Sequence, residues 1–212
     1  MQKYEFTGET KNHKGIILHR IRALVSFEDV KEGDAGGWIE SEANLSREGN
    51  AWVYGNAKVY SNAEVCSNAK VYGDAEVHGD AKVHGDAEVH GNAKVHGDAE
   101  VYGNAKVYGN AKVYGNAWVH DNAEVYGNAK VYINAEVCRP EHILLIGPIG
   151  SRNGYTTFYK NKDNSISVTC GCFSGNIEQF MEKVKQTHGE SEHARIYMAA
   201  AGLAKARIIP EG

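Results

Sequence analysis

The chain of 212 residues is long enough for one or two domains, and its formal net charge of −4 gives no general electrostatic attraction to DNA or RNA. The longest aliphatic run, residues 143–146, is far too short to span a bilayer, and no secretory leader opens the chain, so we expect a cytoplasmic protein without membrane contact. Four cysteines do not make a disulfide framework in a chain of this size, which favours reduced thiols.

Residues 1–36 are predicted to form an N-terminal β cap. Apolar patterning favours strands at Lys3–Thr7 and Gly15–Ala23, with Val25–Phe27 as a candidate third strand. A cap of this kind would cover the apolar residues and unpaired strand edge at the open end of the repeat that follows.

Residues 51–138 repeat a six-residue unit, mostly V-[YHC]-[GS]-[ND]-A-[KEW]. Alanine occupies every sixth position from Ala51 to Ala135, fifteen times in all, and a valine follows each alanine by two positions. A period of six fits neither an amphipathic helix nor a heptad, whereas it fits a short strand followed by a tight corner. Strand alternation then points valine inward, and Gly-Asn or Gly-Asp turns the corner because these residues tolerate positive φ.

This pattern resembles that of hexapeptide-repeat proteins, which fold as left-handed parallel β-helices. The resemblance implies three hexapeptides per triangular coil, with residue i stacked on residue i+18. The spacing extends back to Gly37 after a two-residue insertion before Ala51, which predicts about six coils over residues 37–138. The resemblance also implies a homotrimer, whose neighbouring subunit would cover an aromatic strip at positions 54, 72, 90, 108 and 126. Both ends of the chain look like those of such proteins in phages and prophages.

Stacking every 18 residues gives each face of the solenoid its own column of outward-facing charges. In two columns the sign mostly alternates, but the third column has three lysines in succession beside two tyrosines. This lysine strip is a candidate site for a flat anionic ligand or an acidic partner, and a solvated charged surface is the alternative. It consists of Lys94, Lys112, Lys130, Tyr114 and Tyr132.

Five histidines replace tyrosine within the repeat, which raises the question of an enzyme. The resemblance includes acyl- and acetyltransferases that use a histidine base between subunits, and trimeric carbonic anhydrases that hold zinc with three histidines. His84, His90 and His96 are predicted to lie on three different faces, so they do not converge within one subunit. His78 and His96 stack without a third ligand nearby. We therefore expect surface or interface histidines, with no metal site and no cofactor.

Residues 139–212 are predicted to form a separate α+β domain, because Arg139 and Pro140 end the repeat. The stretch "HILLIGPIG" predicts one strand, and a hairpin turning at Asn161–Asn164 predicts two more. Ser174 is a candidate cap for a first helix with an apolar stripe, and a second helix is predicted from Ser191 to Ile208. The expected order is β-β-β-α-α.

The stretch "GPIGSRNGYTT" is the most site-like segment of this domain. Its glycines permit close backbone approach, and an arginine with several hydroxyl groups suits a phosphate or carboxylate. The stretch lacks the lysine of a P-loop and the spacing of a dinucleotide site, and a tight hairpin connection is the alternative. The candidate ligand-binding residues are Gly150, Ser151, Arg152, Asn153, Thr156 and Thr157.

Three hypotheses for function remain open. The first is a non-catalytic homotrimeric binding protein for a small anionic ligand, such as a nucleotide immune signal sequestered by a phage. The second is a hexapeptide-class acyl- or acetyltransferase that uses coenzyme A. The third is a structural or interaction component of a phage or prophage. Binding of an unmodified nucleotide, binding of acetyl-CoA, or neither would separate them.

Overall fold

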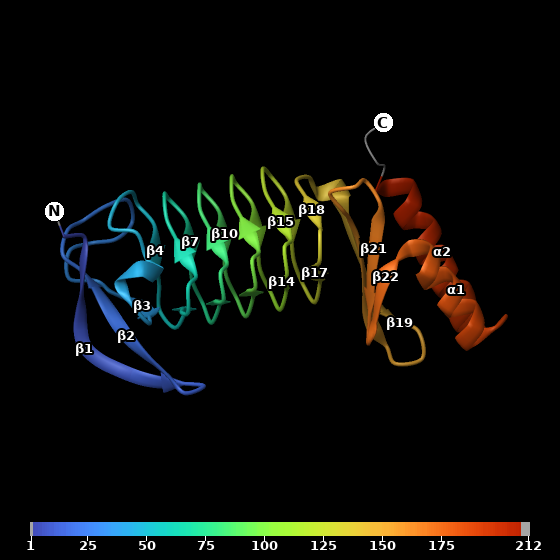
Figure 1. The fold of residues 1–212 in the computed structure, drawn as a ribbon, viewed down its shortest axis with the longest axis horizontal. Helices are drawn as coiled ribbons and strands as arrows, with labels where there is room; N and C mark the ends of the chain where they lie inside the picture. Colours follow the sequence, from blue (N-terminus) through green and yellow to red (C-terminus); the bar gives the residue numbers. More distant parts are fainter. Residues whose placement is uncertain (1, 209–212) are drawn as a thin grey trace.

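The computed structural model describes residues 2–208 and shows a rod with three parts in a row (Figure 1). An antiparallel hairpin of β1 (Tyr4–His13) and β2 (Ile16–Ala23) lies at one end. A parallel β-solenoid of about six turns forms the middle, and a four-stranded sheet with two helices forms the other end. The predicted β-helix, its N-terminal strands and the small C-terminal α+β region are confirmed.

Three sheets run along the solenoid, and each contributes one face. The lysine face comprises β3 (Ala35–Ile39), β5 (Lys58–Val59), β8 (Glu76–Val77), β11 (Lys94–Val95), β14 (Lys112–Tyr114) and β17 (Lys130–Tyr132). The tyrosine face comprises β4 (Trp52–Val53), β7 (Lys70–Val71), β10 (Glu88–Val89), β13 (Lys106–Val107) and β16 (Glu124–Val125). The glutamate face comprises β6 (Glu64–Val65), β9 (Lys82–Val83), β12 (Glu100–Val101), β15 (Trp118–Val119) and β18 (Glu136–Val137).

Neighbouring strands are parallel and pair each valine with the valine 18 positions away, as in Val53 with Val71. In the first coil Ile39 instead pairs with Val59, 20 positions away, which confirms the two-residue insertion. Every repeat alanine and valine from Ala51 to Val137 is at most 1% exposed. The repeat therefore forms one continuous core, because each coil buries its apolar side chains against the next coil.

The corners follow the predicted Gly-Asn and Gly-Asp chemistry. Gly91, for example, has φ +69°, a conformation that costs glycine little because it has no side chain. Asn68 donates from its side-chain amide to the Asp86 carboxylate one coil away, at 3.0 Å, and Asn62 does the same to Asp80 at 2.8 Å. The edges are thus held in register by hydrogen bonds along the rod.

The N-terminal hairpin extends the sheet of the lysine face through antiparallel pairing of β2 with β3. β1 reaches His13, six residues beyond the predicted end, because its second half is a polar, exposed strand that apolar patterning does not detect. The candidate strand Val25–Phe27 is wrong: only an isolated bridge between Phe27 and Val30 forms there. A short helical turn, η1 (Glu42–Asn44), follows β3.

The C-terminal part starts with the turn η2 (Pro140–His142) and continues in a four-stranded antiparallel sheet: β19 (Ile143–Ile149), β20 (Gly154–Lys160), β21 (Ile166–Cys170) and β22 (Phe173–Asn176). The helices α1 (Ile177–His188) and α2 (Glu192–Arg207) follow. The sequence predicted three strands, not four. The tight turn at Gly171, φ +58°, folds the chain back as β22, so α1 is capped by Asn176 and not by Ser174.

This sheet closes the solenoid and carries the helices on its other side (Figure 1). Ile143 and Tyr159 pack into the solenoid core, whereas Phe158 and Val168 pack under the helices. Alternation along each strand produces this division, since successive side chains point to opposite faces. Among residues 2–208, no helix is long and apolar enough to cross a membrane.

Candidate functional sites

The structure brings the members of the lysine strip together on one face. Lys94 pairs with Lys112 in neighbouring strands, Lys112 pairs with Lys130, and Tyr114 pairs with Tyr132. Lys112 and Lys130 are exposed. The ammonium of Lys94 lies 3.3 Å from the Glu76 carboxylate, so part of its charge is already balanced. The strip thus offers two exposed cations in succession rather than three.

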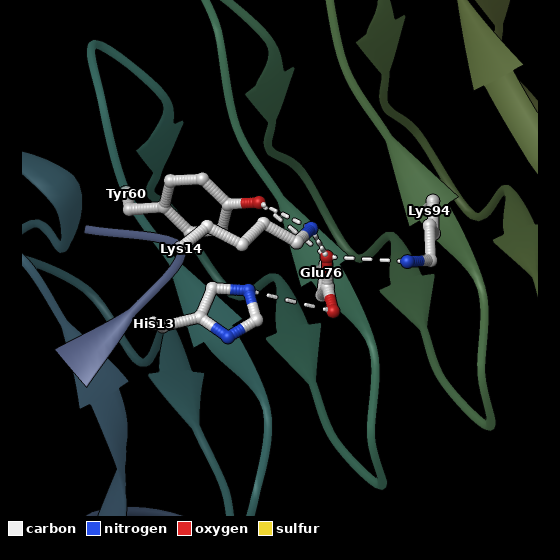
Figure 2. A network of polar contacts seen from close by, with 5 residues as sticks. All are labelled: His13, Lys14, Tyr60, Glu76 and Lys94. Atoms are coloured by element: carbon white, nitrogen blue, oxygen red, sulfur yellow. Dashed lines mark hydrogen bonds and ion pairs between the residues drawn. The ribbon is translucent and has the colours of Figure 1, made fainter. Parts of the chain in front are cut away.

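Glu76, the acidic member of this column, holds the tip of the N-terminal hairpin on the solenoid (Figure 2). The Glu76 carboxylate accepts hydrogen bonds from Lys14 Nζ at 2.9 Å and from the Tyr60 hydroxyl at 3.4 Å. His13 Nε2 lies 3.7 Å from its other oxygen. Together with Lys94 these residues form what we call the hairpin latch. Its partners come from three separate parts of the chain, so the latch fixes the hairpin against the second and third coils.

The latch keeps Glu76 ionised although its side chain is only 10% exposed. Burial alone would raise the pKa of this carboxyl, but Lys14 and Lys94 outweigh burial and lower the pKa to about 2. A buried carboxylate with two ammonium partners is the arrangement expected of a structural ion pair.

The histidines of the lysine face belong to a column of stacked rings. Tyr60, His78, His96, Tyr114 and Tyr132 stack in succession with ring centroids 4.6–4.9 Å apart. Burial, followed by the charge of the next histidine, lowers the pKa of His78 to about 4, and burial also lowers the pKa of His96. Both rings are therefore neutral at pH 7, and His78 is a weak base.

The remaining repeat histidines lie on other faces, as predicted. His84 stacks on Tyr102 beside the glutamate face, and His90 stacks between Tyr72 and Tyr108 beside the tyrosine face. One subunit therefore does not gather His84, His90 and His96 around a common point. Across residues 2–208, no group of three or more His, Cys, Asp or Glu side chains is placed to hold a metal ion.

One hollow lies in the C-terminal part, between the β19–β20 loop, the turn at Gly171 and the two helices. This C-terminal pocket has a volume of about 240 Å³. Ser151 and Arg152 of the predicted loop are among its lining residues. The other lining residues are Gly154, Cys170, Gly171, Cys172, Phe173, Phe180, Lys183, Val184, Thr187, His188 and Tyr197.

The lining of the C-terminal pocket combines positive charge with an apolar wall. Arg152 and Lys183 contribute cations, and no aspartate or glutamate is among the lining residues. Phe173 and Phe180 contact each other with ring centroids 5.5 Å apart, and Phe180 meets the Tyr197 ring edge-on at 5.7 Å. This arrangement suits a ligand with an anionic group and an apolar or aromatic body.

Tyr197 connects the helices to the predicted loop. A side chain at Gly150 would place its Cβ 1.8 Å from the Tyr197 hydroxyl oxygen, so only glycine fits at this point. Burial and the neighbouring Cys170 raise the pKa of Tyr197 to about 12, although Arg152 opposes the shift. Its hydroxyl therefore stays protonated at neutral pH and can donate a hydrogen bond.

Four other predicted loop residues, Gly150 among them, are not part of the lining of the C-terminal pocket. Thr156 is fully buried and donates to Cys170 Sγ at 3.1 Å. Thr157 is 1% exposed, and its hydroxyl oxygen accepts a hydrogen bond from the Lys130 backbone N–H at 3.1 Å. This bond satisfies a backbone donor of β17, the last strand of the lysine face. These two threonines are removed from the candidate ligand donors, because the protein already uses their hydroxyl groups. Asn153 is exposed and closes the turn with its N–H on the Gly150 carbonyl.

The structure does not join the two predicted sites. None of the lysine-strip residues is part of the lining of the C-terminal pocket. Sequence reasoning also missed Lys183, His188 and Tyr197, which α1 and α2 bring to the loop. A weak sequence signal for Lys183 was present. This lysine directly precedes Val184, which belongs to the apolar stripe that packs α1 on the sheet, so Lys183 borders the buried side of the helix.

Comparison with known proteins gives a likeness over part of the chain. No family model matches the chain. A stretch of 62 residues is 39% identical to an uncharacterized acetyltransferase, YdcK, of Escherichia coli K12. This match covers 26% of the chain and 19% of that relative, so it spans a small part of both proteins. The likeness agrees with the predicted resemblance to hexapeptide-repeat proteins, whereas the predicted phage or prophage origin stays a prediction.

Proposed function

We propose that this protein is a non-catalytic binding protein that holds a small anionic ligand in the C-terminal pocket. The observation that carries the proposal is the lining itself: Arg152 and Lys183 face a hollow of about 240 Å³ with no carboxylate among the lining residues. Removing an anion from water is favourable only where fixed cations and donors replace the lost hydration. Ser151 and Tyr197 add hydroxyl donors to the lining.

The apolar wall selects the kind of anion. Phe173, Phe180 and Val184 give one side of the hollow a surface that a bare phosphate would leave uncovered. A nucleotide carries both an anionic group and a flat ring, so it is the ligand class that fits best. Sequestration of a nucleotide signal is the role we assign to such binding. We also propose a homotrimer that covers the aromatic strip of the tyrosine face.

Calorimetric titration with a panel of nucleotides and with inorganic phosphate tests the proposal. We expect at least one nucleotide to bind with micromolar or tighter affinity and to be recovered unmodified. Arg152→Ala and Lys183→Ala should each weaken binding about tenfold or more, since a hydrogen bond to a charged group contributes about 1.5–3 kcal/mol. Lys185→Ala is the matched control, because Lys185 is an exposed lysine of α1 outside the pocket lining.

Two results would contradict the assignment of the site. The first is the absence of heat with every member of the panel. The second is nucleotide binding that survives both Arg152→Ala and Lys183→Ala but is lost in the double variant Lys112→Ala/Lys130→Ala, which would move the ligand to the lysine strip. A structural role would give no binding in any variant.

Acetyl transfer is the second candidate, favoured by the likeness to a protein named as an acetyltransferase. Such an activity requires coenzyme A binding and a base. His78, with its pKa lowered to about 4, is poorly suited as a general base near pH 7. Release of free thiol from acetyl-CoA in the presence of an amine or hydroxyl acceptor separates the candidates, because a binding protein leaves the thioester intact even where it holds the adenine nucleotide part of coenzyme A.

A further inference from the structure

The two C-terminal helices present different outer surfaces. α1 turns polar residues outward, among them Glu182, Lys185 and Gln186. α2 buries one side, where Tyr197, Ala201 and Ala204 pack on the sheet and α1. A surface helix normally carries polar residues opposite its buried side, and an apolar outer side indicates a partner.

The exposed side of α2 carries an apolar stripe along two turns, bordered by the exposed Arg195. Ile196 is 37% exposed and Leu203 is 54% exposed, with the small residues Ala199 and Gly202 exposed between them. At 3.6 residues per turn, Ile196, Ala199 and Leu203 fall on one stripe that points away from Tyr197. We call Glu192, Ile196, Ala199, Leu203 and Arg207 the α2 stripe.

The α2 stripe is complementary to itself in an antiparallel arrangement. In order along the helix it reads negative, apolar, small, apolar, positive. When a second copy runs in the opposite direction, Ile196 of one helix meets the partner's Leu203, and Glu192 meets the partner's Arg207. Arg207 is exposed and donates one hydrogen bond from Nη2 to the Pro140 carbonyl, which holds it near the end of the helix. Ala199 lies at the centre, where small residues allow two helices to approach closely.

We propose that two copies of this chain associate through the α2 stripe about a two-fold axis near Ala199. The partner is a second copy because the order of charges and apolar groups is self-complementary, which an isologous interface requires. The contact lies at the end of the rod, so it does not compete with a trimer along the solenoid faces. If that trimer forms, the two-fold axis joins two trimers into an assembly of six chains.

A cysteine on the axis provides a direct test. In a Cys172→Ser background, which removes the exposed native thiol, Ala199→Cys should give a disulfide-linked dimer under mild oxidation. Lys185→Cys, on the polar side of α1, should stay unlinked. Linking of both variants to the same extent, or of neither, would overturn the proposal.

The solution mass provides a second readout. Leu203→Glu places a carboxylate at an exposed position, so the fold should persist and its circular dichroism should match that of the unmodified protein. Light scattering should show that this variant has half the mass of the unmodified protein, whether two chains become one or six become three. An unchanged mass would refute the interface.

Discussion

The hairpin latch makes a prediction whose size follows from its geometry. Glu76→Gln keeps the shape of the side chain but removes its charge, and leaves Lys14 and Lys94 without their shared anion. The pKa of Glu76 is lowered from 4.5 to about 2, and each unit corresponds to about 1.4 kcal/mol, which sets an upper bound of about 3–4 kcal/mol. The side chains of Lys14 and Lys94 are 57% and 37% exposed, so solvent screening reduces the expected loss to about 1–2 kcal/mol.

The dependence on pH has a defined sign. A carboxyl whose pKa is lowered by folding stabilises the protein above its unfolded pKa, and this stabilisation is lost as the pH falls through the folded pKa. The difference between the unmodified protein and Glu76→Gln should therefore be constant above about pH 5 and shrink between about pH 4.5 and 2. At lower pH both proteins carry a neutral group at this position.

Urea unfolding over this pH range, with amide hydrogen exchange in β1 and β2, is the assay. Exchange should accelerate in the hairpin of Glu76→Gln, since the latch holds the hairpin tip. Glu64→Gln is the control, because Glu64 occupies the same repeat position on the glutamate face and is exposed. Equal stability of Glu76→Gln and the unmodified protein at pH 7 would refute this account of the latch. A difference that persists unchanged at pH 2 would refute its electrostatic origin.

Three further predictions concern the solenoid. Gly91→Ala should lower the free energy of unfolding in urea by about 1–3 kcal/mol, because the new Cβ atom would lie 3.0 Å from the Gly109 backbone at a residue with positive φ. Gly55→Ala is the control and should cost about 1 kcal/mol, because a Cβ at this positive-φ position would have no atom within 4 Å. Thr157→Val should lower the free energy of unfolding by about 1–3 kcal/mol, because it leaves the backbone N–H of Lys130 without an acceptor. Thermal unfolding measures this loss, with Thr187→Val at an exposed position as the control, and equal melting temperatures of the two variants would contradict it. The imidazole of His78 should titrate with a midpoint near pH 4 in an NMR titration. Because folding lowers this pKa from 6.5, the folded protein should lose stability as the pH falls below 6.5 toward 4. A midpoint at pH 6.5 would contradict the burial of the ring.

The solenoid was predictable because its six-residue period resembles that of hexapeptide-repeat proteins. That resemblance implies three repeats per triangular coil, from which the pairing of Val95 with Val113 and the column of Lys94, Lys112 and Lys130 follow. The two-residue insertion was visible as a break in the same spacing. The side-chain alternation within each repeat is also fixed, because a shift of the pairing by one residue would turn charged residues into the core.

The sites depend on contacts that the period does not encode. Glu76 interrupts the lysine column for no reason visible in the repeat, and Lys14, its partner, lies 62 positions earlier in the chain. The C-terminal pocket likewise joins Arg152 to Lys183 and Tyr197, which α1 and α2 supply from more than 30 positions later in the chain. The predicted donors Thr156 and Thr157 looked accessible, but strand alternation and a neighbouring coil bury them.

Because the coils share one repeat pattern, the length of the rod can change by whole coils. Removing or duplicating 18 residues between Gly97 and Gly115 would restore the same valine pairing, the same glycine corner and the same stacked ring on either side of the junction. The separation between the N-terminal hairpin and the C-terminal pocket can therefore change in steps of about 4.8 Å without redesign of either end. Recombination between such repeats would change the distance between the two ends of the rod and leave the residues at each end as they are.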